Sequence, residues 1–341
     1  MFINFNSIKM LFLFMMILST LFSISSISLF NMWMGMEINL ISFIPLMITQ
    51  KNNLSSESSM KYFLIQSISS ANFLFSSIYL MSYYKWFNKF IPLNMIIIII
   101  INISLLMKMG AAPLHFWFPQ IMKNLTWNNC LIISTWQKIL PLITYSYLMN
   151  QFITLLFSMI SAIMGSIMGL NQFSLKLIMT YSSINHLGWM LSSLIISMNI
   201  WLIYMLIYTL INFLMMMMFQ YTNIQQLKQI FSFKSSNIML YMIFLNFFSL
   251  GGLPPFLGFL PKWLTINLLI MNNFYFITFI LIMTSLINLF FYMRLIYSIL
   301  LMNFYEIKFN KVNLINKNLI LFMNFFSMFN LIMISMIFIP F

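Results

Sequence analysis

The sequence predicts an all-α polytopic membrane protein with about eleven transmembrane helices. Of its 341 residues, 62% are hydrophobic and only 6% are charged, and the mean hydropathy is +0.97. A soluble domain of this size cannot cover its surface with so few polar groups. About 20 apolar residues span a bilayer as a helix, and polar, Pro and Gly residues divide the chain into runs of about that length. Each run is therefore a candidate span.

Short polar segments separate the apolar runs and are interpreted as loops. The N-terminal run has Lys9 before it, as a signal peptide would, but it lacks a small-x-small cleavage site and is therefore interpreted as the first span. The expected spans are 8–29, 31–49, 59–82, 91–110, 126–148, 152–170, 176–196, 200–220, 236–271, 274–302 and 317–340.

The loop lysines predict an orientation. If the spans alternate in direction, ten lysines fall on one side and two, Lys85 and Lys89, fall on the other. Basic residues are enriched on the cytoplasmic or matrix side, so the N-terminus is expected there and the C-terminus opposite. The net charge of +13 is thus scattered over loops without a basic face, and no nucleic-acid partner is expected. The ten lysines are Lys9, Lys51, Lys61, Lys123, Lys176, Lys228, Lys234, Lys308, Lys311 and Lys317.

Two Gly/Pro-rich segments indicate an internal repeat, although a chance match of short strings is the alternative. Residues 110–119 read GAAPLHFWFP and residues 251–261 read GGLPPFLGFLP. The two segments lie five expected spans apart, so the chain crosses the membrane in opposite directions at these two places. Helices interrupted by Gly and Pro at matching positions of two inverted repeats commonly mark a transport site. We expect one membrane domain, 1–341, of two inverted five-helix repeats with broken helices, approximately 8–148 and 152–302, plus a C-terminal helix.

Four charged residues lie inside the apolar runs: Glu37, Lys108, Lys138 and Lys262. A charge at the centre of a bilayer costs about 2.5–3.5 kcal/mol, so it is retained where it faces a partner, water or a transport pathway. Burial favours the neutral form of an ionisable group, whereas a nearby opposite charge favours the ionised form. A carboxylate and a lysine buried together therefore have two charge states that differ by one proton, as a proton path requires.

The expected depth differs among these residues. Glu37 is the only acid expected at depth, because Glu57 and Glu306 are assigned to loops. Lys138 lies near the middle of its span, too deep to reach the interface easily, and Pro141 would leave backbone acceptors near its ammonium. It is therefore the strongest candidate for proton exchange.

Lys108 and Lys262 adjoin the two Gly/Pro segments, where an interrupted helix frees backbone carbonyls. For these lysines and for Glu37, the alternative is a place near the interface from which the charge reaches the headgroups. His115 and His186 are possible proton relays because imidazole titrates near neutral pH, although a lone membrane histidine more often packs and forms a hydrogen bond. Polar neighbours of the second histidine, suited to hold water, are Tyr181, Ser182, Ser183 and Asn185.

Residues that hold cofactors or metals are scarce. Cys130 is the single cysteine, which gives neither a disulfide framework nor a Cys-based metal or cluster site. Two histidines are too few to argue for haem or a metal centre, and there is no Gly-rich phosphate loop or dinucleotide fingerprint. No cofactor and no metal are expected in this chain.

The chain resembles the antiporter-like membrane subunits of respiratory complex I, the mitochondrial NADH–ubiquinone oxidoreductase, in their insect form. The resemblance covers nearly the whole chain and is carried by KMGAAPLHFWFPQ, TWQKILP, LKLIMTYSSINHLGWM and LNFFSLGGLPPFLGFLPKW. It implies a proton-translocating core membrane subunit, coupled to NADH oxidation and ubiquinone reduction in other subunits. FMN, the iron–sulfur clusters and ubiquinone are then expected in those other subunits, with no redox centre in this chain.

The resemblance also implies roles for single residues. Glu37 corresponds to the family's conserved carboxylate, and Lys108 to the lysine paired with it. Lys138 corresponds to the central lysine of a buried hydrophilic axis, and Lys262 to the lysine of the second broken helix. Both histidines lie in motifs that line the same axis. Because Lys262 follows a proline, its depth is less well defined than that of Lys138.

Partners and location follow from the same resemblance. The other membrane-arm and accessory subunits of complex I and phospholipids are the expected partners. The expected location is the mitochondrial inner membrane, with the N-terminus in the matrix and the C-terminus in the intermembrane space. The 39 Phe and 36 Met, with a single Val, a single Arg and no Asp, are typical of an AT-rich genome read with a mitochondrial code; an AT-rich bacterium is the alternative source.

Two other functions stay open at this point. One is a structural membrane-arm spacer whose buried charges only brace the arm. The other is a cation/proton antiporter subunit, which fits the buried charges but not the mitochondrial composition. A spacer predicts that replacing Lys138 by Met is tolerated, whereas a proton path predicts lost pumping in an assembled complex.

Overall fold

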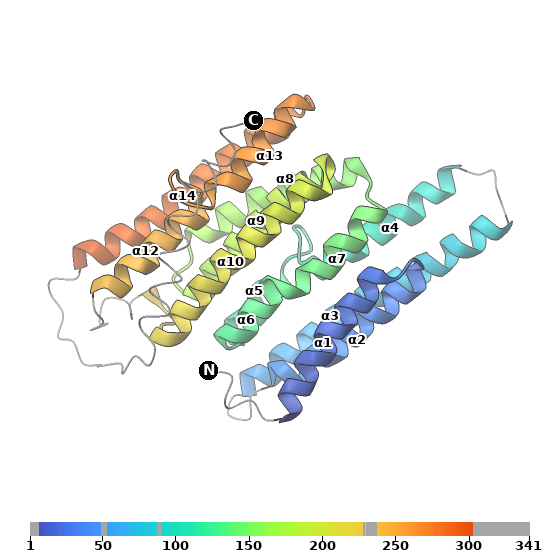
Figure 1. Ribbon diagram of the computed structural model, residues 1–341, viewed down its shortest axis with the longest axis horizontal. Helices are drawn as coiled ribbons and strands as arrows, with labels where there is room; N and C mark the ends of the chain where they lie inside the picture. The colour runs from blue at the N-terminus through green and yellow to red at the C-terminus, as the bar shows by residue number, and fades with distance from the viewer. Residues whose placement is uncertain (1–6, 49–52, 87–90, 228, 230–236, 303–341) are drawn as a thin grey trace. The chain divides into compact units, whose positions relative to one another are not determined.

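The computed structural model describes residues 7–48, 53–86, 91–227, 229 and 237–302. In these residues the regular structure is helical, apart from one isolated bridge between Ser174 and Gln226 (Figure 1). The expected all-α membrane protein is confirmed. The expected C-terminal span 317–340 lies outside the described residues, as do Glu306 and the loop lysines Lys51, Lys89, Lys228, Lys234, Lys308, Lys311 and Lys317.

Six of the described helices are long and apolar enough to cross a membrane. Shorter apolar helices are Met95–Met109, Met242–Gly251 and Phe259–Met271, and α9 carries Ser, Asn and His residues within its run. The expected count of eleven spans thus stays a prediction. The six are Ser7–Ser25, Leu29–Met47, Asn53–Ser82, Gln151–Leu170, Met198–Thr222 and Tyr275–Tyr297.

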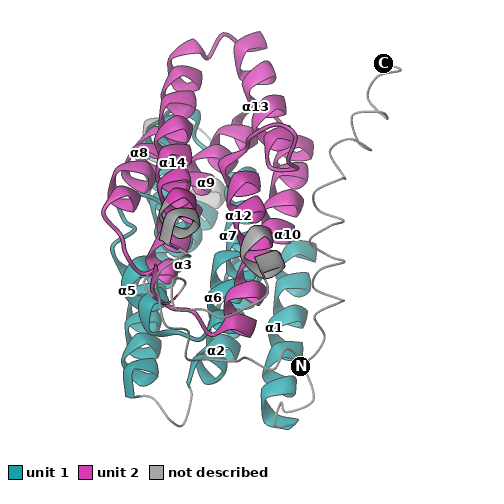
Figure 2. Ribbon diagram, turned by 90° about the vertical axis from the view of Figure 1, so that its left-hand side faces the viewer, with its two compact units in different colours: residues 1–156 teal, residues 157–341 magenta. Residues whose placement is uncertain are grey.

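The chain divides into two compact units, Met1–Leu156 and Phe157–Phe341 (Figure 2). In the first unit α1 packs on α2, α2 on α3, and α3 on α4 and α5, while α7 contacts α1, α4 and α6. The bounds of these helices are α1 Ser7–Ser25, α2 Leu29–Met47, α3 Asn53–Trp86, α4 Ile91–Met109, α5 Trp117–Asn124, α6 Trp127–Ser134 and α7 Trp136–Tyr147.

In the second unit α10 contacts α9, α12 and α13, and α14 contacts α9, α12 and α13. The most enclosed helix of this unit is α9, whose side chains are buried over nearly its whole length. The bounds are α8 Gln151–Leu170, which begins just before the division, α9 Leu175–Ile196, α10 Met198–Thr222, α12 Asn237–Gly251, α13 Phe259–Met271 and α14 Tyr275–Met302.

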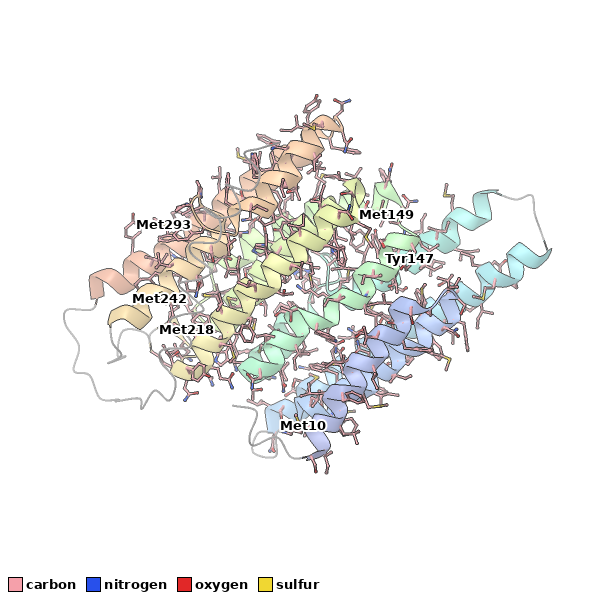
Figure 3. The ribbon with its side chains drawn as sticks, in the orientation of Figure 1. Met10, Tyr147, Met149, Met218, Met242 and Met293 are labelled. Atoms are coloured by element: carbon pink, nitrogen blue, oxygen red, sulfur yellow. The ribbon has the colours of Figure 1, made fainter. Side chains whose placement is uncertain are left out.

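The outer faces of the helices are apolar, as lipid contact requires. Figure 3 shows side chains along all the described helices, and the labelled Met10 and Tyr147 are 47% and 55% exposed. Met218, also labelled, is fully buried within α10. Large apolar side chains therefore occupy both the interior and the exposed faces. Soluble proteins rarely expose apolar patches of this extent to water.

The two Gly/Pro segments end their helices in the same way. Gly110, after α4, has φ +75°, and Gly252, after α12, has φ +76°. In both cases the next residue donates its N–H to the carbonyl five positions earlier, at 3.1 and 3.3 Å. This is the Schellman arrangement, which needs a residue that tolerates positive φ and which satisfies carbonyls at the helix end. The second segment interrupts the expected span 236–271 between Gly251 and Phe259.

The expected span 126–148 is also interrupted, at a place that the sequence did not predict. Thr135 has φ −116° and ψ −71°, and it separates α6 from α7. Its N–H and its Oγ1 both donate to the carbonyl of Leu131, at 3.0 and 2.7 Å. Threonine hydroxyls that bond back to the preceding turn bend helices. Pro141 lies within α7, so the break comes before the proline rather than at it.

The assignment of Glu57 to a loop is wrong. The third helix begins at Asn53 rather than near residue 59, and Glu57 lies in its second turn. The carboxylate of Glu57 pairs with the ammonium of Lys61 at 2.7 Å, one helical turn away, and both side chains are about half exposed. Such i,i+4 pairs support helix formation at exposed ends, which explains why the polar stretch before the apolar run is helical.

Glycines allow α8 and α9 to approach closely. An added Cβ at Gly188 would lie 2.7 Å from the backbone oxygen of Ser158, and one at Gly165 would lie 2.6 Å from the backbone nitrogen of Asn185. Backbone atoms cannot move aside as flexible side chains can. Small residues at such contacts are a common basis of helix packing in membranes.

We therefore expect Gly188→Leu to disrupt the packing of α8 on α9. Overpacking costs about 1–3 kcal/mol, so the amount of folded chain in membranes and its midpoint of thermal unfolding should both fall. The control is Gly251→Ala, whose added Cβ would lie no closer than 3.5 Å to its nearest neighbour, Tyr292 Cδ2. Equal stability of the two variants would contradict this account of the contact.

Candidate functional site

A small cavity in the first unit is lined by two of the predicted site residues, Lys108 and Lys138. Its volume is about 30 Å³, counted as the space open to the centres of water molecules. One water needs about 10–15 Å³ on this measure, so the cavity holds about two waters if its walls are polar enough. The polar side chains that line it are Asn39, Tyr62, Gln66, Lys108, Gln137 and Lys138.

Lys138 lies in the first turn of α7, directly after the break at Thr135. It is only 2% exposed, and its Nζ lies 5.2 Å from the centre of the Phe118 ring, which also lines the cavity. A ring face attracts a cation at this distance. Lys138 is therefore enclosed by the protein, while its expected depth in the membrane stays a prediction.

Lys108 reaches the same cavity from the last turn of α4. A cation is favoured there because the carbonyls at the end of a helix carry partial negative charge. The ammonium of Lys108 donates to Met36 Sδ at 3.4 Å and lies 5.8 Å from the Phe73 ring. Its backbone oxygen accepts from Gln66 Nε2 at 3.2 Å, which joins α4 to α3.

Glu37 lies next to Met36 on α2, and its side chain is partly exposed. Its carboxylate is near enough to Lys108 to interact with the ammonium electrostatically. The hydrogen bond that the structure gives the ammonium goes to the neighbouring Met36 sulfur instead. Glu37 is thus beside Lys108 without a direct hydrogen bond between them.

Lys262 occupies the break in the second unit. Its Nζ donates to the backbone oxygens of Gly251 and Leu250 at 2.8 and 3.4 Å, and it lies 5.8 Å from the Trp189 ring. The last carbonyls of a helix have no hydrogen-bond partner within that helix, and a lysine that donates to them satisfies them. An added Cβ at Gly252 would lie 2.8 Å from Lys262 Cδ, so glycine is needed for this approach.

Lys262 is helical and buried rather than exposed in a loop. Its side chain is only 6% exposed, whereas the next residue, Trp263, is 46% exposed. The two neighbours point in different directions because Lys262 lies in the first turn of α13.

The two histidines differ in their surroundings. His115 lies between α4 and α5, where its Nδ1 is 3.3 Å from the oxygen of Pro113 and its ring stacks on Phe116 at 4.6 Å. It does not belong to the cavity lining. His186, on α9, has its Nδ1 2.9 Å from the hydroxyl of Tyr204 on α10.

The polar surroundings of His186 come largely from α10, which the sequence analysis did not single out. Tyr208 lies one turn after Tyr204, with ring centres of Tyr208 and His186 5.2 Å apart. Tyr208 is hydrogen-bonded to the side chains of Ser183 and Asn212. The i,i+4 spacing of two tyrosines in an apolar helix was the available signal.

Asn185 joins two helices through one side of its amide. Its Nδ2 donates to the backbone oxygen of Ala162 on α8 at 3.0 Å. The side chain is fully buried, and its Oδ1 has no hydrogen-bond partner among the described residues. The expectation that it holds water near His186 stays a prediction.

A reciprocal amide pair beside the first cavity was also missed. Asn39 Nδ2 donates to Gln137 Oε1 at 3.0 Å, and Gln137 Nε2 donates to Asn39 Oδ1 at 3.2 Å. Gln137 also accepts from the Tyr62 hydroxyl at 3.4 Å and donates to Met16 Sδ at 3.5 Å. Only the position of Gln137 directly before Lys138 hinted at this cluster.

The described side chains do not form a metal site. Within the part of the chain that the structure describes, no three His, Cys, Asp or Glu side chains gather closely enough to hold a metal ion. The polar side chains that line the cavity in the first unit are amides, lysines and one tyrosine, which suit hydrogen bonding to water.

Comparisons with known proteins identify the family. Residues 25–288 match the family model described as NADH:quinone oxidoreductase/Mrp antiporter, TM. A chain named NADH-ubiquinone oxidoreductase chain 2 from Anopheles gambiae is 48% identical over 337 residues, 96% of this chain and 97% of that one. Its namesake from Locusta migratoria is 44% identical over 304 residues, 87% of this chain and 86% of that one.

A solved structure shows the same fold. The chain matches one in respiratory complex I from Thermus thermophilus with bound aureothin, with a TM-score of 0.83 and 19% identity over 96% of this chain and 78% of that one. The resemblance inferred from the sequence motifs is confirmed. The chain therefore belongs to the NADH:quinone oxidoreductase/Mrp antiporter transmembrane family and, within it, to the NADH-ubiquinone oxidoreductase chain 2 proteins.

Proposed function

We propose that this chain is a proton-translocating core membrane subunit of respiratory complex I. The observation that carries the proposal is the cavity that Lys108 and Lys138 share with three side-chain amides and a tyrosine. Two titratable groups on one water-sized cavity can exchange a proton through the water between them. Family membership supports the coupling of that transfer to NADH oxidation and ubiquinone reduction.

The redox chemistry is assigned to other subunits of the complex. FMN, the iron–sulfur clusters and ubiquinone belong there in this proposal, and this chain contributes protonatable groups and the helices that hold them. Its partners are then the neighbouring membrane-arm and accessory subunits and the surrounding phospholipids. The location that follows is the mitochondrial inner membrane, with the N-terminus in the matrix and the C-terminus in the intermembrane space.

The proposed architecture is two inverted five-helix repeats, approximately 8–148 and 152–302, followed by a C-terminal helix. The identical endings of α4 and α12 support it, because each ends at a glycine of positive φ before a Pro-containing segment. The division of contacts at Leu156 is compatible with it. Eleven spans remain part of this proposal.

In each unit the proposed proton carriers lie at a helix break. Glu37 modulates Lys108 electrostatically, and Lys138 is the central carrier. In the second unit Lys262 is the carrier and His186, hydrogen-bonded to Tyr204, is a relay. His115 is a weaker relay candidate, since it contacts a backbone oxygen and a phenyl ring.

A structural role is the second candidate, and one observation favours it. Lys262 donates to two carbonyls at the end of α12, which is what a purely bracing lysine would do. The two roles predict different effects when the ammonium of Lys262 is removed. A purely bracing lysine predicts a loss of stability alone, whereas a proton carrier that also braces the helix predicts a loss of both stability and proton stoichiometry.

Lys138→Met is the central test. Replacing a buried charge by an apolar side chain of similar length is often neutral for stability, so the complex should assemble and oxidise NADH. Protons pumped per electron should fall, because one carrier is lost. The measurement is proton uptake per NADH oxidised, in vesicles that contain the variant complex.

Lys61→Met serves as the matched control for Lys138→Met. It removes the same ammonium from an exposed i,i+4 pair, and such pairs contribute about 0–1 kcal/mol. Its stoichiometry should stay at the unsubstituted value. If the proton stoichiometry is unchanged in Lys138→Met as well, the proton path through this lysine is refuted, and the role of a structural spacer is the one that stands.

Glu37→Gln should lower the proton stoichiometry through Lys108. The substitution removes the charge that acts on that ammonium but keeps the shape of the side chain. Combined with Lys108→Met it should cause no further loss, since residues that act as a unit are non-additive. Glu57→Gln, an exposed acid on α3, is the control, and additive losses would argue against the coupling.

Lys262→Met should reduce both stability and pumping. A hydrogen bond from a charged donor contributes about 1.5–3 kcal/mol, and its loss leaves carbonyls at the end of α12 unsatisfied. Thermal unfolding of the purified complex and proton uptake per electron are measured on the same preparation. A loss of stability with full stoichiometry would assign Lys262 to bracing alone.

A further inference from the structure

Gln137 uses every hydrogen-bonding position of its side-chain amide. Its Nε2 donates to Asn39 Oδ1 at 3.2 Å and to Met16 Sδ at 3.5 Å. Its Oε1 accepts from Asn39 Nδ2 at 3.0 Å and from the Tyr62 hydroxyl at 3.4 Å. A primary amide has two N–H donors and an oxygen with two lone pairs, so its orientation is fully determined.

The partners of Gln137 come from three other helices of the first unit. Met16 lies on α1, Asn39 on α2 and Tyr62 on α3, while Gln137 itself lies on α7. Asn39, Tyr62 and Gln137 all line the cavity. One side chain therefore joins four helices at the wall of the cavity that Lys108 and Lys138 share.

The backbone near Gln137 is weakly held by its own helix. The break at Thr135 interrupts the helical hydrogen bonds just before α7, and the N–H groups of a first turn have no partners within their helix. The N–H of Lys138 donates to the oxygen of Thr135 at 3.2 Å. Side-chain hydrogen bonds add support to this turn, and Gln137 makes four of them.

We propose that the Asn39–Gln137 amide pair is a positioning element, which holds the first turn of α7 so that the Lys138 ammonium stays at the cavity. The inference rests on the proposed function, because it concerns the same lysine. Neither amide titrates in the physiological range, so neither carries the proton. Their contribution is to fix the place of Lys138 and of the water beside it.

Asn39 also contributes groups to the cavity itself. Its pairing with Gln137 uses one N–H and one acceptor position of its amide. The second N–H and the second lone pair are available to a water molecule in the cavity, and a buried water needs two to four polar partners. The pair thus offers ordered water both a donor and an acceptor between the two lysines.

Gln137→Met is the variant that tests this inference. Methionine has a similar length and volume but offers no N–H, so it removes the pairing with Asn39 while it fills the same space. A cryo-EM structure of the variant complex reports the place of Lys138 Nζ relative to the Phe118 ring, which is 5.2 Å here. Proton uptake per electron is measured in vesicles on the same preparation.

Asn129→Leu is the matched control. Asn129 Nδ2 joins α6 to α2 through the oxygen of Leu46 at 2.9 Å, and the side chain is as buried as Asn39 but does not line the cavity. A purely structural loss of one amide contact should lower the thermal stability of the complex. It should leave Lys138 in place and the proton stoichiometry unchanged.

The expected result is a displaced Lys138 in Gln137→Met and a stoichiometry equal to that of Lys138→Met, with no further loss when the two are combined. Lys138 in place with full stoichiometry would overturn the inference. If Gln137→Met does not assemble, Asn39→Leu removes the same pair from α2 and is judged by the same two measurements.

The two hypotheses fail differently. If Lys138→Met lowers the stoichiometry but Gln137→Met does not, the proton path stands and the positioning role is wrong. If Gln137→Met displaces Lys138 and both variants pump fully, the positioning role stands and the proton path through Lys138 is wrong.

Discussion

Every backbone N–H and C=O within a bilayer must find its partner inside the protein, and this requirement organises the described structure. A helix that ends at membrane depth leaves carbonyls or N–H groups open. At Gly110 and Gly252 the chain closes its carbonyls with Schellman hydrogen bonds, and at the second of these Lys262 supplies a charged donor as well. Breaks of this kind are therefore places where a lysine is stabilised rather than merely tolerated.

All three lysines singled out as proton carriers lie within a few residues of such a break. Lys108 precedes Gly110, Lys138 follows Thr135, and Lys262 follows the interrupted segment after α12. The C-terminal end of a helix carries partial negative charge that attracts an ammonium, and Lys108 at the end of α4 and Lys262 at the carbonyls that end α12 have this support. Lys138 lies instead in the first turn of α7, where the helix dipole does not favour its charge. In the proposed function, burial and the local environment together set how readily each lysine gains or loses a proton.

The sequence predicted the features that depend on single residues or local strings. Fold class, family, the matching Gly/Pro segments and the burial of Lys108, Lys138 and Lys262 all follow from composition and short motifs. It did not predict the break at Thr135, because threonine is common inside apolar helices and the nearby Pro141 is the stronger signal. The Asn39–Gln137 pair was out of reach because 98 residues separate its members, and no local pattern records that contact. Glu57 was misplaced since a polar stretch was equated with a loop.

The neutral amides and the charged lysines of the first cavity have complementary tasks. A group that must change its charge cannot also hold a fixed geometry by that charge, because its hydrogen bonds change with every proton it gains or loses. Asn39 and Gln137 keep the same donors and acceptors in every protonation state of Lys108 and Lys138. If the site moves protons as proposed, uncharged polar groups are needed to keep its shape, and the four side-chain hydrogen bonds of Gln137 are suited to that task in the first turn of α7.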